Sequence, residues 1–315
     1  MTPPVADGDT STGPAIDATG VTVRYGSKVA VDNVDFAVDA GTVVGLIGPN
    51  GAGKTSLMEC IEGLRSPAAG RIRVHGIDPA ADRTTMARLA GVQLQDSAYP
   101  TRARVDEVCA LFAGFYPKPL DWRELLDQFE LTDKARAQVT KLSGGQRQRL
   151  SLVLALVGDP SMVFLDELTT GLDPEARRMV WDGLRRRNEA GLTVVLTSHH
   201  MDEIEYLCDR VNVMVDGRIV AAGTVSELID AHAGGTERLV VDNPGTELRG
   251  ALEKLGDVTV TPTGGRLRVE VRDAALSEAV AAAIAAADAT GRAITATMDD
   301  VYVALTKQSV EEGDN

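Results

Sequence analysis

The segment Gly48–Thr55 reads Gly-Pro-Asn-Gly-Ala-Gly-Lys-Thr and directly follows the apolar run Val43–Ile47. Glycines at this spacing before a Lys-Thr pair predict a strand, a tight loop and a helix. The glycines let consecutive backbone amides turn toward a phosphate, and the amino end of the helix adds partial positive charge. A glycine-rich turn without a ligand would explain the glycines but not the Lys-Thr pair. We call this segment the phosphate loop. The candidate binding residues are Gly48, Pro49, Asn50, Gly51, Ala52, Gly53, Lys54, Thr55 and Ser56.

Two adjacent carboxylates end a second apolar run, in which Asp166 and Glu167 follow Met162–Leu165. Side chains alternate along a strand, but at its frayed end both can face a crevice beside the carboxyl edge of a sheet. Asp166 suits contact with Mg²⁺ together with Thr55, and Glu167 suits activation of an attacking water. Taken alone, the pair could be two solvated acids at a strand end. Together with the phosphate loop, it predicts a hydrolytic site.

Short Val/Ile/Leu runs alternate with helical stretches between Ile16 and Ala233, and several runs lack two-residue alternation. Such runs indicate strands that are buried on both faces, so we expect an α/β fold with a largely parallel core sheet. The expected strands are Val21–Tyr25, Val43–Ile47, Gly91–Leu94, Met162–Leu165, Thr193–Thr197 and Val211–Val215. The expected helices are Lys54–Glu62, Gln146–Val157, Pro174–Asn188 and Met201–Leu207.

The pattern predicts three parts along the chain, the second of which carries a helical insertion. Residues 1–15 have almost no large apolar side chains, so we expect a disordered leader. Residues 16–233 form the main α/β domain, with a helical insertion at about 97–157. Residues 236–315 follow a Gly-Gly linker in the order strand, helix, strand, strand, helix, strand, which predicts a small α+β, ferredoxin-like domain.

Composition narrows the functional classes. Acidic residues number 46 and basic residues 32, so the net charge is −14, which disfavours nucleic acid as a partner. The three cysteines show no disulfide or zinc spacing, as expected in a reducing compartment. No apolar run approaches the roughly 20 residues needed to cross a bilayer, and the amino end lacks a secretory pattern. We therefore expect a cytoplasmic location.

The segment Leu142–Gln146 reads Leu-Ser-Gly-Gly-Gln. Ser143 and Gln146 have the spacing of a helix capping box, so a purely structural interpretation is available. Such a cap also presents glycine amides at a helix end, where they could donate to a phosphate. Placed between the phosphate loop and the Asp-Glu pair, this segment resembles the signature sequence of ATP-binding-cassette (ABC) ATPases. We call it the signature segment. The resemblance covers about residues 16–233 and implies a P-loop NTPase ABC cassette.

The resemblance implies further site residues. Tyr25 matches the aromatic residue that stacks on adenine, although it could be a half-buried strand residue. Gln95 matches the glutamine that contacts Mg²⁺ or water, with Gln93 as a nearby competitor. His199 matches the histidine that senses the terminal phosphate, although a lone strand-end histidine is more often structural. Asp173 matches the loop that crosses the dimer interface, and its Asp-Pro pair also fits a helix cap. The phosphate-facing residues of the signature segment are Ser143, Gly144, Gly145 and Gln146.

Within the ABC family, three segments of the sequence point to one group of proteins. The segments Leu168–Asp173 and Ser198–Glu203 and the ending Asp299–Thr306 look most like ATP-binding subunits of daunorubicin-resistance-type exporters. We therefore expect an ATPase that uses ATP and Mg²⁺ and dimerises with a second copy of itself around two ATP sites. It would drive a separate integral-membrane permease, from the inner face of the membrane. The alternative is a soluble ABC ATPase that acts on a ribosome or another cytosolic complex.

Overall fold

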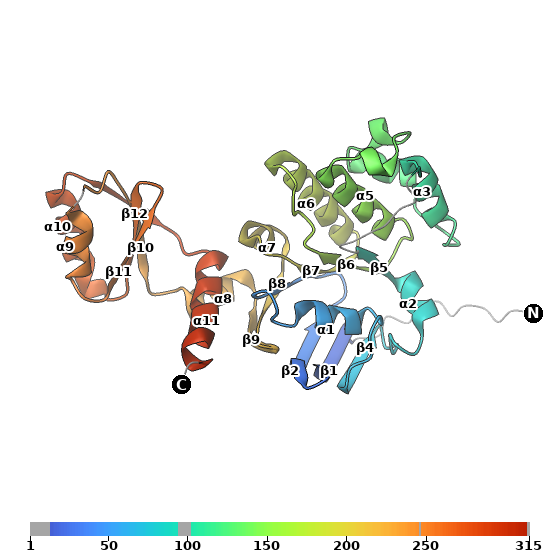
Figure 1. Cartoon of the computed structure of the whole chain (residues 1–315), viewed down its shortest axis with the longest axis horizontal. Helices are drawn as coiled ribbons and strands as arrows, with labels where there is room; N and C mark the ends of the chain where they lie inside the picture. Colours follow the sequence, from blue (N-terminus) through green and yellow to red (C-terminus); the bar gives the residue numbers. More distant parts are fainter. Residues whose placement is uncertain (1–12, 94–101, 246, 314–315) are drawn as a thin grey trace, which may run out of the picture. The chain divides into compact units, whose positions relative to one another are not determined.

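The structure of the chain is a computed structural model that describes residues 13–93, 102–245 and 247–313, with side chains as far as Thr306 (Figure 1). The chain divides into two compact units, Met1–Val225 and Ser226–Asn315. Ala15, which we had placed in the leader, is buried, and its carbonyl accepts a hydrogen bond from the backbone amide of His75. In the ranges that the structure describes, no helix is both long and apolar enough to cross a bilayer.

The first unit is built around a six-stranded sheet with the order β5-β6-β7-β3-β8-β9. Its strands are β3 (Val43–Ile47), β5 (Ala90–Gln93), β6 (Met162–Asp166), β7 (Thr193–Thr197), β8 (Arg210–Val215) and β9 (Arg218–Gly223). Neighbours from β5 to β8 run parallel, and β9 pairs antiparallel with β8. All residues of β3 and β7 are buried, as their unbroken apolar runs predict. The expected α/β fold with a largely parallel sheet is confirmed.

A separate three-stranded sheet, in the order β2-β1-β4, is antiparallel throughout. Its strands are β1 (Ile16–Tyr25), β2 (Lys28–Val38) and β4 (Ala69–Val74). The expected strand Val21–Tyr25 is confirmed as the carboxyl half of β1, and it belongs to this antiparallel sheet. Buried and exposed residues alternate along the carboxyl half of β2, which is the pattern of a sheet with one face in the core and one in solvent.

Helices cover both faces of the six-stranded sheet. The helix α1 (Lys54–Ile61) shares one hydrophobic core with Val44 and Leu46 of β3 and with the antiparallel sheet. On the other face, Ile204 of α7 (Met201–Leu207) lies close to Gly45 of β3, where an added Cβ would come within 3.0 Å of it. The helix α6 (Pro174–Glu189) lies on the same side of the sheet as α7 (Figure 1).

The region between β5 and β6 is helical in its described residues, as expected (Figure 1). It contains α3 (Val105–Ala113), α4 (Trp122–Gln128) and α5 (Gly144–Leu156). A further short helix, α2 (Arg83–Leu89), precedes β5. The expected capping box is confirmed, because the Ser143 hydroxyl accepts from the Gln146 amide and the Gln146 side chain accepts from the Ser143 amide. The cap explains why α5 begins at Gly144 rather than at Gln146.

The second unit contains a four-stranded antiparallel sheet in the order β11-β12-β10-β13. Its strands are β10 (Glu237–Asp242), β11 (Val258–Thr263), β12 (Arg266–Val271) and β13 (Thr290–Ile294), and its helices are α8 (Val225–His232), α9 (Leu248–Glu253), α10 (Ser277–Ala286) and α11 (Met298–Gly313). The expected α+β order of strands and helices is confirmed. The last strand, β13, pairs with β10 from Thr290 to Ile294.

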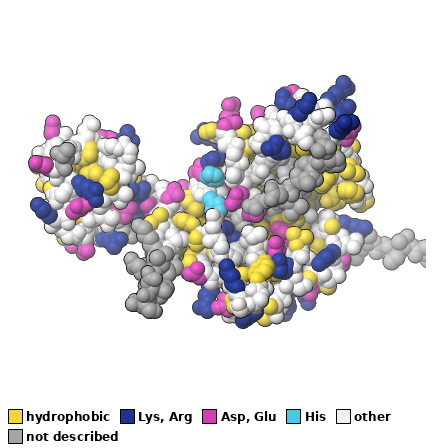
Figure 2. Space-filling view, viewed as in Figure 1, with side chains coloured by type: hydrophobic (Ala, Val, Ile, Leu, Met, Phe, Trp, Pro, Cys, Tyr) yellow, Lys and Arg dark blue, Asp and Glu magenta, His cyan; other side chains and the backbone are white. Residues whose placement is uncertain are grey.

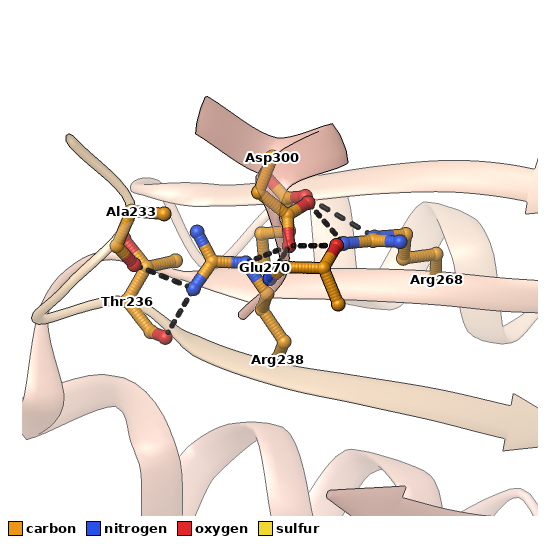
Figure 3. Close-up of polar contacts among 7 residues, drawn as sticks. Ala233, Thr236, Arg238, Arg268, Glu270 and Asp300 are labelled. Carbon is orange, nitrogen blue, oxygen red and sulfur yellow. Dashed lines mark hydrogen bonds and ion pairs between the residues drawn. The ribbon is translucent and has the colours of Figure 1, made fainter. Parts of the chain in front are cut away.

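A cluster of charged side chains holds α11 to the sheet of the second unit (Figure 3). Arg238 of β10 donates to the carbonyls of Ala233 and Thr236 and lies 3.4 Å from the carboxylate of Asp300. Arg268 of β12 donates to the other Asp300 oxygen. Arg238 and Asp300 are both nearly buried, so each requires the other as a partner. The cluster thus joins the chain that follows α8 to the start of α11.

Candidate active site

The phosphate loop connects β3 to α1, as its sequence predicts. Gly48 has φ +154°, and a Cβ there would lie 1.9 Å from the carbonyl oxygen of Met214. Gly53 has φ +105°, and a Cβ there would lie 2.2 Å from the carbonyl oxygen of Ala30. Both contacts are far shorter than any side chain tolerates, so glycine is required for conformation and for space. The loop is therefore packed tightly against β8 and β2.

The Lys54 side chain lies inside the loop. Its ammonium donates to the carbonyls of Gly48 at 2.7 Å and Pro49 at 3.1 Å, and the side chain is only 9% exposed. Burial lowers the pKa of Lys54, while the nearby carboxylates of Asp166 and Glu167 act to raise it. Lys54 is thus a buried cation whose hydrogen-bond acceptors are backbone carbonyls. Phosphate oxygens are stronger acceptors, so a bound phosphate could replace these carbonyls as partners of the ammonium.

An open pocket of about 480 Å³ lies above the loop. It brings together most of the predicted nucleotide and catalytic residues from segments far apart in the sequence. Its lining comprises Tyr25, Lys28, Ala30, Asn50, Gly51, Gly53, Lys54, Thr55, Ser56, Asp166, Glu167 and His199. Of the other loop residues, Gly48 and Pro49 supply the carbonyls that hold Lys54, and Ala52 is buried.

The two acids of the pocket are oriented by the strand beside them. Asp166 accepts a hydrogen bond from the Thr197 hydroxyl of β7, and the Glu167 amide donates to the Thr197 carbonyl at 3.1 Å. Glu167 has φ +50°, a left-handed conformation that interrupts strand alternation just after β6. This turn explains how two consecutive carboxylates reach one pocket. Thr197 is a supporting residue that the sequence did not single out, because only the pairing of β6 with β7 brings it there.

His199 lies beside Glu167, with 2.9 Å between His199 Nε2 and Glu167 Oε1. Both side chains are about one-third exposed and line the pocket. The Gln148 side chain of α5 donates to the Glu167 carbonyl at 3.0 Å and supports the same turn. A histidine that contacts a carboxylate at the rim of a phosphate loop can respond to a negatively charged group that enters the pocket.

Tyr25 lies at the mouth of the pocket and is 44% exposed. Its hydroxyl is 3.1 Å from the Ser56 hydroxyl, and the Arg65 guanidinium lies 4.5 Å from the centre of its ring. Arg65 was not predicted, because nothing in the sequence places it near Tyr25. An exposed aromatic ring that is fixed at both its edge and one face offers a stacking surface.

The remaining predicted residues lie elsewhere. Of the described residues that line the pocket, none comes from the signature segment, and Asp173 is also absent. Asp173 caps α6 by accepting from the amides of Glu175 and Ala176, so the structural interpretation of its sequence holds. Gly145 lies against the same loop, because a Cβ there would be 2.9 Å from Leu172. Gln95 lies outside the described residues, whereas Gln93 ends β5 and is buried.

Glu62, just after α1, allows a pH prediction. Burial, with the nearby Asp166 and Glu59 carboxylates, raises its pKa from 4.5 to about 7. Because the folded-state pKa is raised, stability that is fully present below pH 4.5 is lost as pH rises toward 7. Relative to Glu62→Gln, the wild type should lose up to about 3 kcal/mol of unfolding free energy over this window.

Chemical denaturation of both proteins between pH 4 and 8 measures this effect. Glu124→Gln, the same substitution at an exposed position, serves as a control for the change of residue type. Parallel pH curves for wild type and Glu62→Gln would contradict a raised Glu62 pKa.

The fold and the pocket together define a P-loop NTPase. A family model described as ABC transporter matches residues 31–170. The daunorubicin resistance ATP-binding protein DrrA3 of Streptomyces coeruleorubidus is 38% identical over 305 residues, which cover 93% of this chain and 96% of that protein. The Nod factor export ATP-binding protein I of Mesorhizobium japonicum is 40% identical over 232 residues, which cover 72% of this chain and 68% of that protein.

Solved structures agree. A structure described as the ATP-binding subunit of an ABC transporter matches with a TM-score of 0.65 and 26% identity, over 70% of this chain and 94% of that chain. A dimeric bacterial ABC transporter cassette matches with a TM-score of 0.62 and 24% identity, over 66% of this chain and 98% of that chain, which supports the fold. The chain belongs to the ATP-binding proteins of ABC transporters. It is an ATPase of that family, with the expected cassette fold.

Proposed function

We propose that this chain is the nucleotide-binding subunit of an exporter, whose ATP hydrolysis drives a separate integral-membrane permease. The observation that carries the proposal is the single pocket in which Lys54, Asp166, Glu167 and His199 meet above the phosphate loop. The relatives named for daunorubicin resistance and Nod factor export support an exporter. The relative named for daunorubicin resistance matches over both units.

In this proposal each pocket residue has a distinct role. The loop amides and Lys54 bind the phosphates of ATP, and Tyr25 stacks on the adenine through the ring face that Arg65 leaves free. Glu167 accepts a proton from the water that attacks the terminal phosphate. His199 stabilises the position of that phosphate and holds Glu167 through their 2.9 Å contact.

The residues of the pocket also fit Mg²⁺, which prefers oxygen ligands and usually retains substrate phosphates among them. Thr55 and Asp166 line the same pocket and supply a hydroxyl and a carboxylate. Gln95 is a further proposed ligand, outside the described residues. When bound, Mg²⁺ would neutralise part of the charge on the phosphate oxygens.

We further propose that two copies form the complete site. The signature segment does not line the pocket of its own chain, yet its Ser143-capped helix offers glycine amides to an anion. In a head-to-tail dimer, each signature segment would cover the phosphate loop of the partner, and Asp173 would lie at the same interface. A two-fold arrangement makes both sites equivalent from one type of chain. ATP would close this dimer, because its terminal phosphate gains donors from both copies.

The helical insertion offers a surface for the permease. Within it, Val105 and Val108 are buried core residues, whereas Leu111 and Phe115 are 57% and 68% exposed. Hydrophobic side chains gather at the outer edge of this region in the space-filling view (Figure 2). Exposed large apolar side chains of this kind mark protein contacts. The chain would thus reside in the cytoplasm, at the inner face of the membrane.

A capture experiment tests the exporter role. Tagged chain isolated from detergent-solubilised membranes of its native host should retain one integral-membrane protein, and Phe115→Asp should reduce that recovery at least about tenfold by placing a charge in an apolar contact. Val220→Asp, at another exposed apolar residue, is the matched control and should have little effect. Recovery of ribosomes without a membrane protein would instead support the alternative of a soluble ABC ATPase, which the relatives do not favour.

A further inference from the structure

Glu203, in the first turn of α7, is an acid with no exposed surface. Its Oε1 accepts a hydrogen bond from the indole Nε1 of Trp181 in α6 at 3.0 Å. Its Oε2 is buried without a hydrogen-bond partner among the described residues. A buried carboxylate with one bonded oxygen is costly, and an apolar side chain of similar size would avoid that cost. The position of Glu203 therefore indicates a role other than stability.

The backbone around Glu203 leads directly to the pocket. The Glu203 amide donates to the carbonyl of His200 at 3.1 Å, and the His200 amide donates to the Ser198 hydroxyl at 3.0 Å. These bonds close the short turn between β7 and α7. His199 lies within this turn, and its ring meets Glu167 at 2.9 Å. A shift of α7 would consequently move His199 relative to Glu167.

The other partner, Trp181, belongs to a helix that is anchored at its own end. The helix α6 begins directly after Asp173, whose side chain caps it. Trp181 is 6% exposed and stacks on Tyr206 of α7 with ring centres 5.1 Å apart. Several hydrogen bonds join these packed helices in the described residues, and the one from Trp181 to Glu203 is buried. The bonds from Arg177 to Asp202, from Arg185 to the Tyr206 carbonyl and from Tyr206 to Asp182 are exposed.

We propose that Glu203 is a positioning residue for ATP hydrolysis: through Trp181, it fixes α7 on α6 and thereby holds His199 against Glu167. The inference rests on the proposed roles of His199 and Glu167. It adds a residue outside the pocket to the machinery, because Glu203 does not line the pocket and touches nothing that enters it. The bond between Glu203 and Trp181 also connects the turn that carries His199 to α6, the helix that Asp173 caps.

Steady-state ATP turnover by the full-length chain tests the proposal. Glu203→Leu should lower kcat by about 10- to 100-fold, as expected when a catalytic group is displaced by about 1 Å, while KM for ATP changes less than about twofold. Glu203→Gln retains the acceptor for Trp181 and should restore kcat to within about threefold of wild type. Tyr206→Phe removes one of the exposed bonds between the same helices, the one to Asp182, and should leave kcat unchanged. Wild-type kcat in Glu203→Leu would overturn the proposal.

A double-mutant cycle separates this inference from the function on which it rests. If Glu203 acts through His199, Glu203→Leu should cause almost no further loss of kcat in a His199→Ala background. An equal further loss would overturn the inference and leave the role of His199 intact. Unchanged turnover in His199→Ala alone would instead overturn the proposed role of His199.

A double variant tests whether a loss of kcat in Glu203→Leu comes from misfolding. Trp181→Phe with Glu203→Leu replaces both polar groups with apolar ones, a change that buried pairs often tolerate. A cooperative melting transition and wild-type nucleotide affinity would establish that this double variant is folded. It should show the same loss of kcat as Glu203→Leu, and a wild-type kcat would again refute the positioning role.

Discussion

Replacing Glu167 with Gln is expected to lower steady-state ATP turnover by about 10²- to 10⁴-fold, the range for loss of a positioned general base. The glutamine keeps the size of the side chain and an oxygen toward His199, so the geometry of the pocket should survive. It cannot accept a proton from water, and the bound ATP should persist. With ATP and Mg²⁺, gel filtration of this variant should therefore show a dimer, because in the proposed two-copy site the terminal phosphate remains as the group that both copies would bind.

The control for this experiment is Glu175→Gln, an exposed acid in the first turn of α6. It removes one carboxylate without touching the pocket, and turnover should stay within about twofold of wild type, as is usual for surface substitutions. A Glu167→Gln protein that hydrolyses ATP at the wild-type rate would exclude Glu167 as the base. A strictly monomeric protein in saturating ATP would count against the two-copy site.

Replacing Lys54 with Ala is expected to weaken ATP binding by at least about 10- to 100-fold, the equivalent of one lost hydrogen bond to a charged group. The variant also leaves the Gly48 and Pro49 carbonyls, which the ammonium now holds, without that donor. Titration with a fluorescent ATP analogue measures the affinity. A melting curve recorded in parallel shows whether the loop has lost its structure as well.

Lys28→Ala is the matched comparison, because Lys28 lines the same pocket but lies outside the phosphate loop. We expect a smaller loss of affinity there, since Lys28 is not enclosed by loop carbonyls. Equal affinities in Lys54→Ala and wild type would refute the assignment of the loop as the phosphate site.

The sequence predicted the parts of the fold in which local pattern and packing agree. The bounds of β3 and β7 match the expected ones, because unbroken apolar runs are visible without knowledge of the neighbours. The bounds of α7 also match. The antiparallel sheet was not recognised, since its strands are long, partly solvated and interrupted by register shifts at β1. The pairing of β1 with β4, which is distant in the sequence, leaves no local pattern comparable to the unbroken apolar runs of the parallel strands.

The sequence predicted the motif residues of the candidate site, but not the neighbouring groups that orient them. The phosphate loop, Asp166, Glu167 and His199 converge as expected in one pocket. The left-handed backbone at Glu167, the Thr197 hydroxyl on Asp166 and the guanidinium over Tyr25 were not predicted. Each depends on which strands and loops become neighbours after folding. The bond from Trp181 to Glu203 belongs to the same class, because it joins two helices that are separated by β7 in the sequence.

The tight seating of Gly48 and Gly53 has a thermodynamic consequence. The oxygens behind them belong to Met214 and Ala30, which are residues of two different sheets. The loop is therefore shaped before any nucleotide arrives, and little ordering entropy remains to be lost on binding. Substitutions far from the pocket that change the spacing of the two sheets should alter thermal stability and nucleotide affinity in proportion.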